Sequence, residues 1–158
     1  MNGTVAIATI GLVLHSLAAV VWVGGMFFAL VALRPATAPL EPGPRLDLWA
    51  RVLGRFFAWV IAAIVLLLAS GYAMVFAAFG GFRGIALYIN LMQGVGIVMM
   101  LLFFHLYFAP WRRFRAALAR DDRPEAARQL DQIRWIVTVN LILGLVTAAM
   151  GSSGRYWG

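Results

Sequence analysis

The pattern of hydrophobic and polar positions divides the chain into four long apolar segments separated by polar stretches. The apolar segments cover about 5–33, 56–79, 85–109 and 134–150. A helix of about 20 apolar residues crosses a bilayer, and about 17 can suffice. The pattern therefore predicts an all-α protein, a four-transmembrane-helix bundle of up-down-up-down topology. The whole chain, residues 1–158, is expected to form a single membrane domain.

The first polar stretch, 34–55, begins with a proline-rich linker. Residues 37–44, TAPLEPGP, hold three of the six prolines, so this linker is predicted not to be helical. Beyond it, apolar residues recur at helical spacing and predict an amphipathic entry into the second span; they are Leu46, Trp49, Leu53, Phe56 and Phe57.

The other two connections carry turn and capping signals. The second span is followed by a glycine-rich turn at 80–84, and the third by Pro110 at the start of the loop 110–133. Asp122 followed by Glu125 is typical of a helix N-terminus with a capping box. We therefore expect the third helix to extend to about Ala119, and the fourth to begin near Arg123, outside the membrane.

Composition and charge support a membrane protein and indicate its orientation. The chain is 63% hydrophobic and 12% charged, whereas soluble domains are about half apolar and a quarter charged. The formal net charge of +7 could suggest a nucleic-acid partner, but the placement of the 13 basic residues, all of them arginines, argues against it. Eleven of these arginines fall at 34, 45, 51, 55, 112, 113, 115, 120, 123, 128 and 134.

This arginine distribution follows the positive-inside rule. It predicts that the loops 34–55 and 110–133 are cytoplasmic and that both termini and the 80–84 turn lie outside. The expected location is a bacterial cytoplasmic (inner) membrane, which the chain crosses several times. The bilayer is then the expected environment, and nucleic acid is not an expected partner.

The polar residues exclude several kinds of chemistry. Cysteine is absent, and the six acidic residues all lie in the two arginine-rich loops. Disulfides, thiolate metal sites and carboxylate-based sites within the spans are therefore not available, and no catalytic set is visible.

Two histidines lie within predicted spans, where ionisable residues are candidates for function. His15 falls in the expected outer half, near the level of Ser70, Asn90 and Gln93, whereas His105 lies close to the inner boundary. From the helix rise, the two differ in depth by very roughly 15–20 Å, which disfavours one haem held by both. Each histidine could instead form a hydrogen bond that holds helices together, as Asn90 and Gln93 could. For His105 the expected partner would be Asn140.

Methionines near the level of His15 suggest a second kind of site. Met74, Met92 and Met150, with His15, offer the thioether and imidazole ligands that Cu(I) accepts. The alternative is that these methionines simply fill an apolar core.

The first span also carries a family resemblance. His15, the sequence from Trp22 to Gly25 (WVGG) and the closing Arg34-Pro35 resemble the first helix of the CopD copper-resistance membrane domain. The chain is more distantly similar to the HemJ-type protoporphyrinogen oxidases, four-helix proteins that use haem b. Relatives in this wider group often have a lysine in the third helix, where this chain offers Asn90 or Gln93. The resemblance implies copper handling or haem binding.

Three functions are compatible with these observations. The first is binding of a transition metal, preferably copper, in the outer half for uptake or delivery, with His15, Met74, Met92 and Met150 as metal-ligand candidates. The second is a haem b redox protein, which as an enzyme would be a haem-dependent oxidoreductase. Its cofactor-binding candidates are His15, His105, Trp22, Asn90 and Gln93. The third is a scaffold subunit, either in a homo-oligomer or in a larger membrane complex.

Overall fold

The computed structural model describes residues 3–83 and 85–157, without the side chains of Phe79 and Arg155. Gly84, the last residue of the predicted 80–84 turn, and the ends of the chain lie outside the described residues. In chain order the elements are α1 (Gly3–Phe27), a π-helix (Phe28–Leu33), α2 (Arg34–Ala36), α3 (Pro42–Phe79), α4 (Leu87–Phe108), α5 (Pro110–Ala119), α6 (Arg123–Ser153) and a 3₁₀ turn (Gly154–Tyr156). Over the described residues there is no strand, which confirms the all-α prediction.

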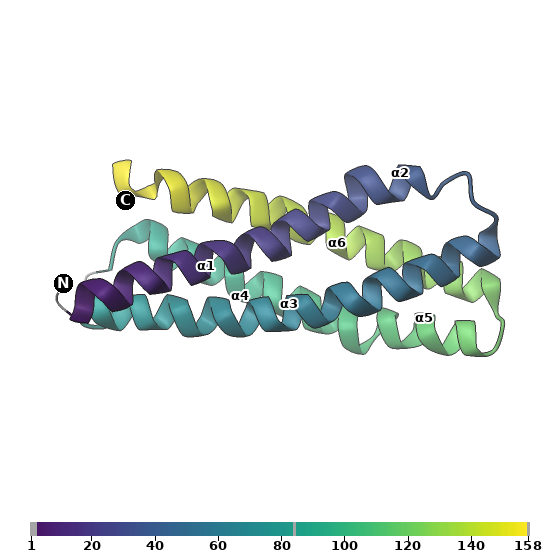
Figure 1. Cartoon of the computed structure of the whole chain (residues 1–158), viewed down its shortest axis with the longest axis horizontal. Coiled ribbons are helices and arrows are strands. Elements are labelled where there is room, and N and C mark those ends of the chain that lie inside the picture. The colour runs from purple at the N-terminus through teal and green to yellow at the C-terminus, as the bar shows by residue number, and fades with distance from the viewer. Residues whose placement is uncertain (1–2, 84, 158) are drawn as a thin grey trace.

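The long helices run up and down in one elongated bundle (Figure 1). Four stretches are long and apolar enough to cross a membrane: Gly3–Ala36, Pro42–Ala78, Leu87–Ala119 and Arg123–Ser153. Both chain ends and the α3–α4 connection lie at one end of the bundle, and the two arginine-rich connections lie at the other. The predicted four-helix topology is confirmed, while the side of the membrane on which each end lies remains a prediction.

A π-helix interrupts the first span just before Pro35. The proline ring would clash with the carbonyl four residues earlier, that of Val31, and proline has no N–H to donate. Val31 lies within the π-helical stretch Phe28–Leu33, where the backbone is wound more widely than in an α-helix. The span therefore passes the proline without ending, and its helical structure continues to Ala36.

The helix α3 begins at Pro42, several residues before the second predicted span. The prediction that the linker 37–44 is not helical is therefore wrong for its last three residues. Pro42 and Pro44 lie in the first turn of α3, where the missing N–H costs nothing because that group has no helical partner. The expected amphipathic entry is confirmed, because Leu46, Trp49 and Leu53 are all buried.

Glycines form the turn at the opposite end of α3. Gly80 ends the helix with φ +66°, and Gly81 has φ +121°. Both values are readily adopted only by glycine, as expected from the glycine-rich sequence of this turn. The next helix then begins at Leu87.

The third span is broken at Ala109, which separates α4 from α5. Ala109 has φ −111° and ψ −84°, and Pro110 opens α5 as its first residue. The predicted end at Ala119 and start at Arg123 are both confirmed. At the start of α6, the Asp122 carboxylate accepts a hydrogen bond from the Glu125 N–H at 3.1 Å. In a full capping box the Glu125 side chain would accept from the Asp122 backbone N–H. Here the Glu125 carboxylate instead accepts from the side chains of Arg128 and Gln129.

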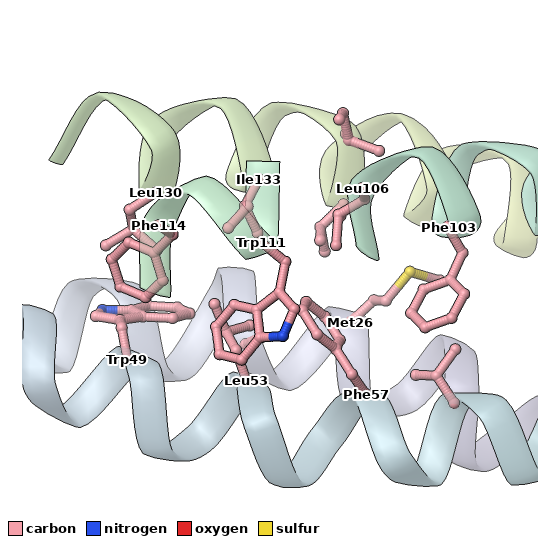
Figure 2. Packing of buried hydrophobic residues seen from close by; sticks show 14 of the residues in the cluster. Met26, Trp49, Leu53, Phe57, Phe103, Leu106, Trp111, Phe114, Leu130 and Ile133 are labelled. Carbon is pink, nitrogen blue, oxygen red and sulfur yellow. The ribbon is translucent and has the colours of Figure 1, made fainter. Parts of the chain in front are cut away.

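The buried core is concentrated in the arginine-rich half of the bundle. Figure 2 shows Trp49, Leu53 and Phe57 of α3 facing Trp111 and Phe114 of α5 and residues of α6. Phe57 and Trp111 pack edge to face with ring centroids 5.2 Å apart. Each such aromatic contact adds about 0.5–1.5 kcal/mol beyond the area that it buries.

The opposite half of the bundle is less densely packed. In α1 the core begins only at Ala18, in α3 it ends at Ile64, and in α4 it begins at Met99. The helix α1 packs along α3, and α4 packs along α6; near the chain ends, Gly11 lies against Met74 and Gly151 lies against Met92. The bundle is therefore two helix pairs joined mainly by the core of the arginine-rich half.

Polar contacts reinforce that same half. Arg123, at the start of α6, forms an ion pair with Asp47 of α3 at 3.3 Å. The Arg134 guanidinium lies 4.9 Å above the Trp49 ring, and the Trp49 indole N–H donates to the Thr37 hydroxyl at 3.1 Å. These contacts tie α6 and the first loop to α3.

Candidate metal site

His15 lies at the interface between α1 and α3. Its side chain is half-buried, and Nδ1 lies 3.1 Å from the hydroxyl oxygen of Ser70. Ser70 is 6% exposed. The sequence placed these two residues at a similar depth, and the structure brings them into contact.

The hydrogen bonds around Ser70 assign the proton on His15. The Ser70 hydroxyl donates to the carbonyl of Leu66, one turn earlier on its own helix, as serine commonly does within helices. A hydroxyl has a single proton, so with Ser70 donating to Leu66 its oxygen accepts from His15, and the tautomer consistent with this arrangement carries the proton on Nδ1. In a neutral imidazole, Nε2 then carries the free lone pair that a metal ion needs.

Two glycines allow the bulky side chains of this interface to fit between the helices. A Cβ at Gly71 would lie 3.3 Å from His15 Cε1, and one at Gly11 would lie 2.8 Å from Met74 Cγ. The same position at Gly11 is 3.6 Å from the Met74 sulfur. Gly11 and His15 are one turn apart on α1, so His15 and Met74 occupy neighbouring levels of the same interface.

The other two candidate methionines belong to the other helix pair. Met92 of α4 packs against Gly151 of α6, where a Cβ would lie 3.0 Å from its terminal methyl carbon and 3.5 Å from its sulfur. Met150 is half-buried on α6. The four predicted metal ligands are thus divided, with His15 and Met74 at the α1–α3 interface and Met92 at the α4–α6 interface.

The remaining polar candidates near this level link or flank the helices. Gln93 of α4 donates from Nε2 to the Tyr72 hydroxyl of α3 at 3.3 Å, whereas Asn90 is exposed. Trp22 is buried, with its ring edge to face against Phe103 and centroids 6.3 Å apart. It therefore belongs to the aromatic core.

His105 and Asn140 do not form the expected pair. The Asn140 side chain is buried and donates from Nδ2 to the backbone carbonyl of Met99 at 3.1 Å. His105 is exposed on α4. The structure therefore places the two histidines in different settings, one within a helix interface and one on the outer surface.

Among the described residues, no group of three or more histidine, cysteine, aspartate and glutamate side chains could hold a metal ion. The α1–α3 interface has an imidazole at His15 and a thioether at Met74 on neighbouring levels, and these two ligand types are ones that Cu(I) accepts.

Sequence reasoning did not identify Gly11, Gly71 and Tyr72 as parts of this region. The signal for the glycines was available as spacing, because Gly11 precedes His15 by one turn and Gly71 precedes Met74 by three residues. Without the helix pairing, however, nothing in the sequence showed that these two stretches face each other.

Comparison with known families agrees with this architecture. The family described as Copper resistance protein D matches residues 50–153, about two thirds of the chain. This chain belongs to the CopD family. No curated protein and no solved structure matches it significantly.

The family match and the sequence resemblance rest on different parts of this CopD protein. The resemblance was noted in the first span, from His15 to Pro35, which the match does not include. The matched region contains Ser70 and Met74, the α3 residues that face His15 and Gly11. Membership of this family supports a multi-pass membrane protein linked to copper handling.

Proposed function

We propose that this protein binds Cu(I) at the α1–α3 interface through His15 Nε2 and the Met74 sulfur, for uptake or delivery of the ion. The observation that carries the proposal is the hydrogen bond between His15 and Ser70. This contact would orient the imidazole and favour the tautomer with its proton on Nδ1, in which Nε2 carries the lone pair for a metal ion. Copper is here the cargo of the protein.

The small number of donors at this site favours transfer over storage. His15 and Met74 supply two ligands, an imidazole and a thioether, and the nearest carboxylates of the sequence lie in the arginine-rich loops. An ion that must move on needs a site that binds it well enough to enter but loosely enough to leave. If the arginine-rich loops are cytoplasmic, as the charge distribution predicts, this site lies in the outer half of the membrane.

The proposal is tested by Cu(I) competition on purified protein under reducing conditions with a chromogenic Cu(I) chelator. Wild-type protein should withdraw one Cu(I) from the chelator, and His15→Ala should lose this binding while keeping its expression and helix content. His105→Ala is the matched control, because it removes the other intramembrane histidine from an exposed position. Equal Cu(I) binding by wild type and His15→Ala would contradict the proposed site.

An optical spectrum of the dithionite-reduced protein separates the alternative functions. The copper proposal predicts no Soret band. A Soret band with sharp α and β bands that is lost in His15→Ala would instead identify haem b at this residue. Copper and haem contents that are both unchanged in His15→Ala would leave the scaffold function.

A further inference from the structure

A groove of about 490 Å³ opens between α3 and the helices α4 and α5 on the arginine-rich half of the bundle. Its floor is formed by small residues one turn apart on α3, namely Ala50, Gly54 and Ala58. The opposite wall contains Trp111, and a Cβ at Gly54 would lie 3.6 Å from its indole ring. The groove thus exists because three small residues lie opposite a large aromatic side chain.

Three arginines surround the groove at the loop end. Arg51 and Arg55 are one turn apart on α3, and Arg115 approaches from α5 with its guanidinium 6.0 Å above the Trp111 ring. In the part of the chain that the structure describes, the ion pairs use Arg123, Arg128 and Arg134. The groove arginines therefore have no acidic partner there, and no acidic side chain lines the groove.

The other end of the groove is apolar. It is lined by Ile61 of α3 and Tyr107 of α4. Ile61 lies ten positions after Arg51 on α3, which corresponds to roughly 15 Å along the axis. A ligand that fills the groove must therefore have a negatively charged end and an apolar end.

We propose that this groove binds an anionic phospholipid from the adjacent leaflet. Its phosphate would contact Arg51, Arg55 and Arg115, and an acyl chain would lie along Ala58 and Ile61. Guanidinium groups match phosphate oxygens with paired donors, and basic pockets between transmembrane helices are known sites for anionic headgroups. Trp111 and Tyr107 lie where aromatic residues favour the membrane interface. A free phosphate would use only the arginine end.

Native mass spectrometry of the full chain in detergent tests the proposal, with added phosphatidylglycerol or phosphatidylcholine at equal concentration. Wild-type protein should retain one phosphatidylglycerol in preference to phosphatidylcholine. The triple variant R51Q/R55Q/R115Q should retain phosphatidylglycerol roughly 100-fold less well, given the usual contribution of each arginine beside an anionic lipid. Equal retention of the two lipids by wild-type protein would overturn the proposal.

A matched charge control separates a site from general attraction. The variant R34Q/R112Q/R120Q also removes three positive charges, but it removes them from exposed arginines that do not line the groove. This control should keep the preference for phosphatidylglycerol. If both triple variants lose it equally, the arginines act as a diffuse basic surface, and the specific groove is excluded.

A second variant tests the apolar end without changing charge. Ala58→Leu places a larger side chain on the floor of the groove and should reduce retention of phosphatidylglycerol about tenfold or more. Ala69→Leu, at an exposed position of α3 away from the groove, should leave it unchanged. Alanine and leucine are both good helix formers, so a loss confined to Ala58→Leu reports blocked binding. Undiminished retention by Ala58→Leu would overturn the placement of the acyl chain.

Melting temperatures of the wild-type protein distinguish a phospholipid from a free anion as the ligand of the groove. Phosphatidylglycerol should raise the melting temperature of wild-type protein, and inorganic phosphate or glycerol phosphate at the same concentration should not. Equal stabilisation by inorganic phosphate would assign the arginines to a free anion and overturn the lipid.

Discussion

Asn140 of α6 donates its side-chain amide to the backbone carbonyl of Met99 on α4, at a distance of 3.1 Å. The Asn140 side chain is almost completely buried, with 2% of its surface exposed. A side chain bound to a backbone carbonyl can pair α4 with α6 whatever residue occupies position 99. His105 plays no part in this contact.

Asn140→Ala should therefore destabilise the bundle, whereas His105→Gln should not. Intramembrane hydrogen bonds contribute about 0.6 kcal/mol on average and up to about 2, and truncation of a buried side chain adds a packing loss. Reversible unfolding in mixed detergent micelles would measure both variants. The His105→Gln protein should also keep its bound ligand. Loss of ligand from a folded His105→Gln protein would instead make His105 a ligand.

Ser70→Ala should weaken copper binding without removing either proposed ligand. The substitution deletes the acceptor that orients the His15 imidazole and selects its tautomer, and loss of such a partner typically costs about 10–100-fold in metal affinity. The Cu(I) competition assay measures it. Ser16→Ala, at an exposed position next to His15, is the matched control and should bind as wild type. Wild-type affinity in Ser70→Ala would show that the hydrogen bond does not support metal binding.

The orientation of the bundle is expected to follow its arginines. A reporter that is active only in the periplasm should work when fused to the C-terminus and fail when inserted in the α5–α6 loop at Asp121. The reverse pattern would place the arginine-rich loops outside and move the proposed copper site to the inner half.

Gly144→Ala should destabilise the protein, and Gly94→Ala should not. A Cβ at Gly144 would lie 2.8 Å from Val23 Cγ2 and 3.2 Å from the Met99 terminal methyl carbon. Valine is stiff about χ1, so α1 would have to move, at a cost of about 1–3 kcal/mol. At Gly94 nothing lies within 4 Å, so alanine should gain up to about 1 kcal/mol in helix propensity. Unfolding measurements on the pair check the prediction, and equal stabilities would contradict the close approach of α1 and α6.

The sequence was sufficient for the helices but not for their pairing. Segment lengths, Pro110 and the Asp122 cap are local signals, and each predicted a feature that the structure confirms. The start of α3 was misjudged because proline disfavours helix interiors but is tolerated in a first turn. Local signals cannot show which faces of the helices pack against each other.

The candidate site shows the same limit. Position along the chain gives depth in the membrane, so His15 and Ser70 were correctly placed at one level. Met92 lies at about the same level but packs against α6. Which helix a side chain faces depends on how the helices pair, and the sequence does not give this pairing. Gly94 and Gly96 of α4 show the same limit, because a Cβ at either would meet nothing within 4 Å, so these glycines admit no neighbouring helix of this chain.

The unequal packing of the two halves has a mechanical consequence. A bundle with an aromatic core at one end and fewer contacts at the other has the form of a hinge. The core is the joint, and the two helix pairs are the arms on either side of it. Spreading the arms at the open end would break the Gln93–Tyr72 hydrogen bond but few buried apolar contacts, whereas opening the joint would expose Phe57 and Trp111. Regions with few buried contacts open locally at a small free-energy cost. His15 and Met74 lie together within one arm, so the arms can separate while these two donors keep their positions.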